Sequence, residues 1–119
     1  VERTGLAAAS VDVAVTALNF HDIYNGAGEA QALAFLRAVH GLLKTGGTLG
    51  LIEHSGAAGA NNAQLHRLNE EVARKVIARS GFRVADSSNL LSNPDDDLAK
   101  GVFANRGKTD RYLLKLVKE

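Results

Sequence analysis

Ionisable and aromatic side chains gather directly after two apolar segments of this sequence. The segment 11–18 is followed by Asn19, Phe20, His21, Asp22 and Tyr24, and the segment 48–52 is followed by Glu53, His54 and Ser55. A histidine titrates near neutral pH, so His21 is a candidate general base, and a carboxylate from Asp22 or Glu53 would orient it or bind a cation on a substrate. The ring of Phe20 or Tyr24 would form a wall for a ring-shaped ligand.

Other interpretations of these polar residues stay open. His21 and Asp22 are equally well explained as part of a turn that caps the following segment. A third hypothesis has His21, Asp22, Glu53 and His54 bind a metal ion for hydrolysis, although no strong ligand spacing supports it.

The remaining polar candidates have simpler structural explanations. We expect His40 to pack beside the apolar stripe of a helix and His66 to be solvated near the start of another helix. The acidic run 95–97 follows Pro94 and matches no EF-hand spacing, so it favours a helix N-terminus over a metal site. Glu70 and Glu71 precede Arg74 and Lys75 by four residues, as on a solvated helix face.

Hydrophobic periodicity predicts the elements that must position the two polar groups. The segment 11–18 is almost continuously apolar, which is typical of a strand buried on both faces of a parallel sheet. A polar turn over 25–28, a helix over 29–43 that ends in Lys44-Thr45-Gly46-Gly47, and a strand over 48–53 follow. We expect a loop over 55–62, a second helix over 63–80, and strands over 82–86 and 112–117 that are separated by a long polar segment.

This order of elements predicts an α/β fold. Alternating strands and helices favour parallel strands joined by right-handed crossovers, and the last strand, reached without a helix, is expected to be antiparallel. In such sheets ligands bind beyond the carboxyl ends of the parallel strands. The polar residues after 11–18 and after 48–52 are therefore expected to meet at one edge of the sheet.

Composition limits the classes of partner. The chain has 119 residues, 45% of them hydrophobic, and a formal net charge of +1, so residues 1–119 are expected to form one domain. The charges are dispersed, which disfavours nucleic acid and membrane surfaces as partners and leaves a small molecule as the expected substrate. No apolar run approaches the ~20 residues of a membrane helix, and the absence of cysteine leaves the compartment open.

Four segments of the sequence resemble class I S-adenosylmethionine-dependent methyltransferases. Asp12, an apolar strand and Leu18-Asn19-Phe20-His21-Asp22 resemble the fourth strand and following loop of that family, in which a histidine commonly stands nine residues after the aspartate, as His21 does here. The segment 42–53, LLKTGGTLGLIE, is similar to the fifth-strand signature, with Thr45 in place of the usual proline. Ser80-Gly81-Phe82 resembles the start of the sixth strand and 112–117 the seventh. Together with 93–97 and 107–112, these motifs are also similar to a bacterial group of predicted methyltransferases.

The resemblance implies half of a Rossmann-like methyltransferase sheet, strands four, five, seven and six, with flanking helices. It covers Ser10 to the end, and no G-x-G-x-G follows a strand, so we expect S-adenosylmethionine to be a cofactor only of a longer, complete protein. It implies catalytic roles for His21, Asp22 and Asn19 and substrate-binding roles for Phe20, Tyr24, Glu53 and His54. The alternative is a truncated, non-catalytic α/β module for binding or assembly.

The same sheet order predicts self-association. In the family, strand four lies beside strand one, so without strand one the segment 11–18 becomes an edge. That edge has no proline or lysine to prevent pairing. We therefore expect a homodimer in which two copies of 11–18 pair antiparallel.

Overall fold

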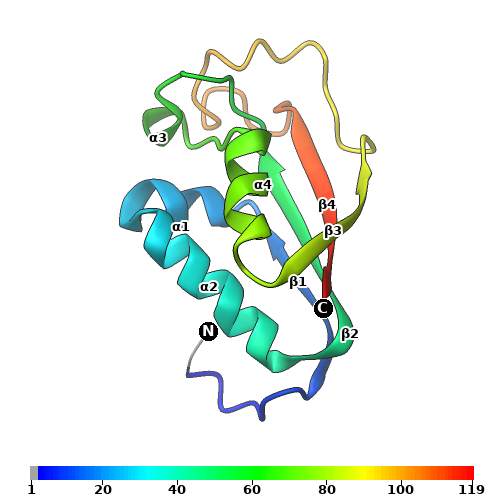
Figure 1. The fold of residues 1–119 in the computed structure, drawn as a ribbon. Coiled ribbons are helices and arrows are strands. Elements are labelled where there is room, and N and C mark those ends of the chain that lie inside the picture. The colour runs from blue at the N-terminus through cyan, green and yellow to red at the C-terminus, as the bar shows by residue number, and fades with distance from the viewer. Residues whose placement is uncertain (1–2) are drawn as a thin grey trace.

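The computed structural model describes residues 3–119, and its strands form one four-stranded sheet (Figure 1). The strands are β1 (Val11–Ala17), β2 (Leu43–His54), β3 (Phe82–Ser88) and β4 (Arg111–Lys118). Their order is β1-β2-β4-β3, with β1 parallel to β2 and β4 antiparallel to both of its neighbours. This confirms the predicted half-sheet and its antiparallel last strand.

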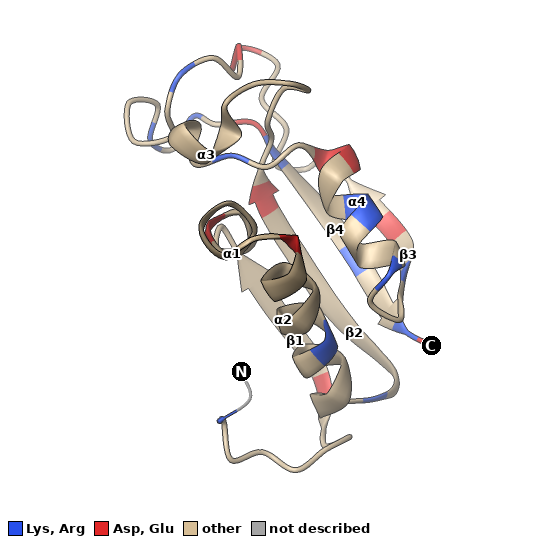
Figure 2. Ribbon diagram, turned by 60° about the vertical axis from the view of Figure 1, so that its left-hand side comes forward, with Lys and Arg blue, Asp and Glu red and all other residues tan. Residues whose placement is uncertain are grey.

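Three of the four helices in the described part of the chain cover one face of this sheet (Figures 1 and 2). They are α1 (Phe20–Ala27), α2 (Glu29–Leu42) and α4 (Glu70–Ala78), and a single turn, α3 (Asn62–Leu65), lies beyond the sheet. The core forms where helix residues such as Leu36 and Ile77 meet Leu49, Leu51 and Leu114 of the central strands. None of these helices has the length and apolar character needed to cross a bilayer.

The opposite face of the sheet is more exposed, which corrects one expectation. Val13 and Val15 of β1 are 62% and 68% exposed, so this strand is buried on one face and not on both. A continuous apolar run is typical of a strand covered on both sides, but among residues 3–119 the helices α1, α2 and α4 all lie on the other face of the sheet.

Helix α1 was not expected, because the sequence indicated a polar turn around Asn25. Its apolar residues Phe20, Ile23 and Tyr24 repeat at helical spacing and pack on the core. The intervening Gly26 lowers helix propensity and obscured this pattern. Gly28, at φ 93°, separates α1 from α2. The consequence is that His21 and Asp22 lie in the first turn of a helix.

The expected helix over 63–80 is interrupted. It is broken at His66, whose φ of 56° ends α3, and the chain then runs extended through Leu68, which bridges Ser55 of the strand end. Asn69 restarts the helix by accepting hydrogen bonds from the backbone N–H groups of Glu71 and Val72. The interruption places Arg67, fully buried, beneath the long loop that follows β3.

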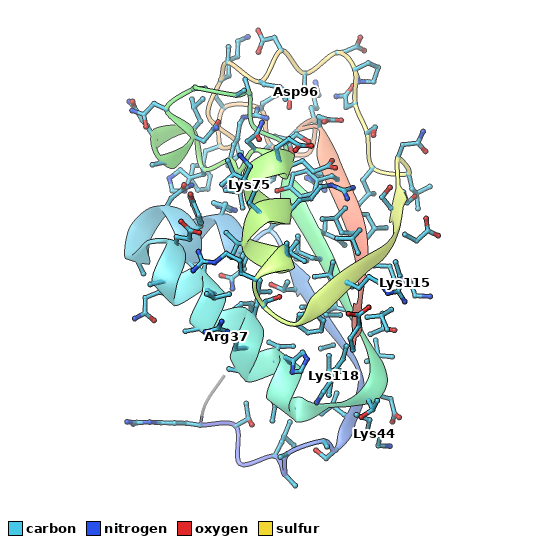
Figure 3. The ribbon with its side chains drawn as sticks, in the orientation of Figure 1. Arg37, Lys44, Lys75, Asp96, Lys115 and Lys118 are labelled. Atoms are coloured by element: carbon cyan, nitrogen blue, oxygen red, sulfur yellow. The ribbon has the colours of Figure 1, made fainter. Side chains whose placement is uncertain are left out.

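An ion pair fixes that loop to the rest of the fold. Asp96, labelled in Figure 3 above the end of the sheet, receives hydrogen bonds from Arg67 Nη1 at 2.8 Å and Nη2 at 3.1 Å. It also accepts hydrogen bonds from the backbone N–H groups of Leu98 and Asp110. The run 95–97 does not begin a helix as expected, since its central carboxylate is used for this buried pair.

Candidate functional site

The parallel strands β1 and β2 end at the same edge of the sheet, and a buried carboxylate organises that edge. Glu53 is fully buried. Its Oε2 accepts a 2.7 Å hydrogen bond from the backbone N–H of His21, and its Oε1 accepts a 2.8 Å hydrogen bond from the backbone N–H of His54. The same Oε1 lies 2.6 Å from His21 Nδ1. Glu53 therefore joins the end of β2 to the start of α1.

This contact fixes the orientation of the His21 ring. Because the Glu53 carboxylate only accepts, Nδ1 carries a proton and donates it, and Nε2 is directed toward Asp22, 3.2 Å from its Oδ1. Burial lowers the pKa of His21, but the hydrogen bond to Glu53 and the negative charges of Glu53 and Asp22 outweigh burial and raise it above 6.5. His21 is thus a basic imidazole with one nitrogen tied to a carboxylate.

Asp22 also contacts His66, which the sequence analysis did not assign to the site. His66 Nδ1 lies 3.3 Å from Asp22 Oδ1, so one carboxylate oxygen lies between two imidazole nitrogens. The expectation that His66 is merely solvated overlooked this contact, since the left-handed turn that directs it has no signal in hydrophobic periodicity.

His54 is buried on the other side of His21. Its Nδ1 lies 2.7 Å from Thr109 Oγ1, and its ring centroid lies 5.7 Å from that of His21. Burial lowers the pKa of His54 to about 4, with positive charge from Arg111, His21 and Arg67 acting in the same direction and Glu53 opposing it. His54 is therefore neutral at physiological pH.

Two hollows lie at this end of the molecule. A cleft of about 540 Å³ is lined by Tyr24 and Asn25 of α1, the loop 58–63, and residues of α4. A smaller hollow of about 200 Å³ contains His54 together with Phe103, Arg106 and Arg111. Tyr24 and His54, both expected to bind substrate, thus line separate hollows.

The other predicted site residues have different placements. Phe20 is fully buried and packs against Phe35, so it belongs to the core and does not face the edge as expected. Asn19 is the N-cap residue of α1 without a side-chain cap, and Asp22 lies in the first turn of that helix, where a carboxylate is favoured by the helix dipole. The backbone carbonyl of Ser55 accepts a hydrogen bond from Arg67 Nη1.

Comparisons with known proteins support this fold. No protein-family model matches the chain, and no curated protein sequence shows a significant match. Solved structures do match. A SAM-dependent methyltransferase from Aquifex aeolicus covers 99% of this chain at 15% identity and a TM-score of 0.64. A methyltransferase from Methanosarcina mazei covers 98% at 11% identity and a TM-score of 0.67, and the cyclase SpnF covers 98% at 14% identity and 0.67.

The chain therefore has a partial Rossmann-like methyltransferase fold. It spans 51%, 63% and 53% of the length of those three proteins, respectively, or roughly half. The identities are too low for the likeness to show more than the fold, and SpnF bears the name of a cyclase. Function has to be argued from the site itself.

Proposed function

We propose that this chain forms the acceptor side of a methyltransferase that uses S-adenosylmethionine, as part of a longer protein. The observation that carries the proposal is the buried pair of Glu53 and His21 at the carboxyl ends of two parallel strands. This is the edge at which open α/β sheets bind ligands. The fold and the partial coverage of the solved methyltransferases support the same assignment.

In this proposal His21 acts as a general base. With Nδ1–H bonded to Glu53, the lone pair of Nε2 accepts the proton of an acceptor hydroxyl, amine or thiol, and Glu53 stabilises the imidazolium that forms. Leu18, at the end of β1, has a φ of 57°. Such backbone strain at a bulky residue is frequent beside functional sites, and here it turns the chain from the strand into the helix that bears His21.

The methyl group would come from S-adenosylmethionine. Among residues 3–119 no G-x-G-x-G sequence joins a strand to a helix, because β1 leads to α1 through Leu18 and Asn19 and the segment 55–61 between β2 and α3 has only Gly56 and Gly59. The residues present do not form a cradle for this cofactor, and its binding is assigned to a segment outside them. The chain's own contribution is to orient the acceptor and remove its proton.

Calorimetric titration with S-adenosylmethionine tests the assignment. We expect no measurable binding by the 119-residue chain and clear binding by the longer protein. In the longer protein, release of S-adenosylhomocysteine with a panel of phenols, amines and thiols then identifies the acceptor class. A longer protein that does not bind S-adenosylmethionine would leave the non-catalytic module as the explanation.

The variant Glu53→Gln measures the proposed pair. It removes the charge that stabilises the imidazolium, and loss of general-base catalysis typically lowers the rate by ~10²–10⁴-fold. The rate of transfer should fall within that range while the affinity for S-adenosylmethionine stays unchanged. Glu29→Gln, at an exposed position of α2 that lines neither hollow, is the matched control and should leave the rate unaffected.

We also propose that the chain expressed alone dimerises through β1. This strand is at the edge of the sheet, and its Val13 and Val15 are exposed. Leu18 N–H donates to Ile52 O across the β1–β2 seam. Because strand hydrogen bonding alternates with a period of two, the N–H of Val15 points away from β2 and is free to pair with a second copy.

Sedimentation velocity tests the dimer. We expect the wild-type chain to be dimeric and Val15→Pro to be monomeric, because proline removes the outward N–H without disturbing the bonds to β2. Val15→Thr keeps that N–H and should remain dimeric. A monomeric wild type at high concentration, or a dimeric Val15→Pro, would show that β1 is not the interface.

A further inference from the structure

Three potential metal ligands converge beside the buried pair. His21 Nε2 and His66 Nδ1 lie 3.2 Å and 3.3 Å from Asp22 Oδ1, and one ligand atom from each residue lies within 4.8 Å of the others. The residues come from the first turn of α1 and from the end of α3. The fold thus brings together two imidazoles and one carboxylate that are far apart in the sequence.

The spacing of these atoms fits a single small cation. Ligand atoms around a tetrahedral zinc ion at ~2.1 Å lie roughly 3.4 Å apart. The two distances to Asp22 Oδ1 agree with that separation, and only the separation between the imidazoles has to adjust. Three protein ligands leave the fourth position of a tetrahedral ion open, as in catalytic zinc sites.

A second feature supports a cation at this place, because the outer nitrogen of His21 is already oriented for one. Histidines that bind metals almost always donate their other ring N–H to a carboxylate or a carbonyl, which fixes the ring and makes the ligating nitrogen more basic. Glu53 does this for His21, with Nδ1 2.6 Å from Oε1. The Glu53 carboxylate already accepts three hydrogen bonds, so we do not assign it as a metal ligand.

His66 is also directed toward the cluster by its backbone. Its φ of 56° is unfavourable for a residue with a side chain. The Phe103 ring packs against that of His66 in an edge-on arrangement, with the two centroids 5.1 Å apart. The strained turn places His66 Nδ1 3.3 Å from Asp22 Oδ1.

We propose that His21 Nε2, Asp22 Oδ1 and His66 Nδ1 form a binding site for zinc or a similar divalent transition-metal ion. Two imidazoles and one carboxylate favour such ions over Mg²⁺, which prefers oxygen ligands. This replaces the set His21, Asp22, Glu53 and His54 that the sequence suggested. His54 is excluded because its ring is turned to Thr109.

The site goes beyond the proposed methyl transfer and does not depend on it. A cation on His21 Nε2 occupies the lone pair that would accept a proton, so the two roles of this nitrogen exclude each other. With an ion bound, an oxygen or sulfur atom of the acceptor would occupy the open fourth position. The metal ion, and not His21, would then promote loss of the acceptor's proton by lowering the pKa of that atom. The metal state would then determine which acceptors the site activates.

Titration of the tag-free chain with ZnCl₂ tests the site without S-adenosylmethionine. Calorimetry should show one ion bound per chain, and excess MgCl₂ should not displace it. CoCl₂ should give the visible absorption of a four-coordinate ion. A wild-type chain that binds no zinc would overturn the proposal and leave the methyl-transfer proposal untouched.

Two ligands can be substituted with little effect on the fold. His66→Asn suits a left-handed backbone, and Asp22→Asn keeps the shape of an exposed side chain. Each should weaken zinc binding by more than ~10-fold, and Glu53→Gln, through the orientation of His21, by roughly 10–100-fold. His40→Gln and His54→Gln remove histidines outside the cluster and should bind as the wild type does. Wild-type affinity in His66→Asn would refute the assignment.

Discussion

Replacing Asp96 with asparagine should lower the free energy of unfolding by about 3–5 kcal/mol, the usual effect of removing one partner of a buried ion pair. Arg67 and Asp96 both have fully buried side chains. The variant leaves the guanidinium charge of Arg67 in the interior without its counter-charge, and it puts an amide where five donors now converge on a carboxylate. Urea denaturation followed by circular dichroism measures the loss.

An exposed pair of the same length provides the control. Arg74 Nε lies 2.8 Å from Glu70 Oε2, the same distance that separates Arg67 Nη1 from Asp96 Oδ2, but both of its side chains are partly exposed. Glu70→Gln should therefore change stability by at most ~1 kcal/mol. Equal losses in the two variants would mean that burial does not determine the strength of the Arg67–Asp96 pair.

Acidification from neutral pH to pH 4 should remove about 3 kcal/mol of stability that His54 contributes. Its pKa is about 4 in the folded chain, whereas an unperturbed histidine has a pKa of 6.5, and each unit of difference corresponds to ~1.4 kcal/mol. The unfolded chain binds the proton first, so this stability is fully present above pH 6.5 and is lost as the pH falls toward 4. Denaturation at several pH values, with a chelator present, measures it.

The variant His54→Gln isolates this effect. It has no titrating ring at position 54, so its stability should depend much less on pH over the same range. His21 acts in a different range, since its pKa is raised. Its contribution is present below pH 6.5 and is lost as the pH rises through its folded pKa. If wild type and His54→Gln lose stability equally toward pH 4, the assignment to His54 is wrong.

The strands of this fold were predictable because their signals are local. Val11 to Leu18 is apolar and largely β-branched, and the segment 42–53 carries a family signature on consecutive residues. The strand order followed from the resemblance, and it is confirmed in the sheet. Helix α1 was missed because Gly26 and Gly28 outweighed a short apolar pattern.

The site was only partly predictable, since its main contacts join distant segments. The two strand ends identified His21 and Glu53, which the structure brings into hydrogen-bond contact. Nothing in the neighbourhood of His66 indicates Asp22, and nothing near Asp96 indicates Arg67. Each of these pairs depends on the left-handed turn at His66 and the extended residues after it, which interrupt an otherwise helical periodicity.

The position of β4 has a consequence for how the chain reaches this structure. β4 lies between β2 and β3, although it follows both in the sequence. The unit of β1, α2 and β2 can form early from contacts close in sequence, whereas β3 has no strand to pair with until β4 has been synthesised. On the ribosome, the edges of β2 and β3 that β4 later covers thus stay open for the time that the loop after β3 is translated. This interval is when chaperone binding and misassembly compete with folding.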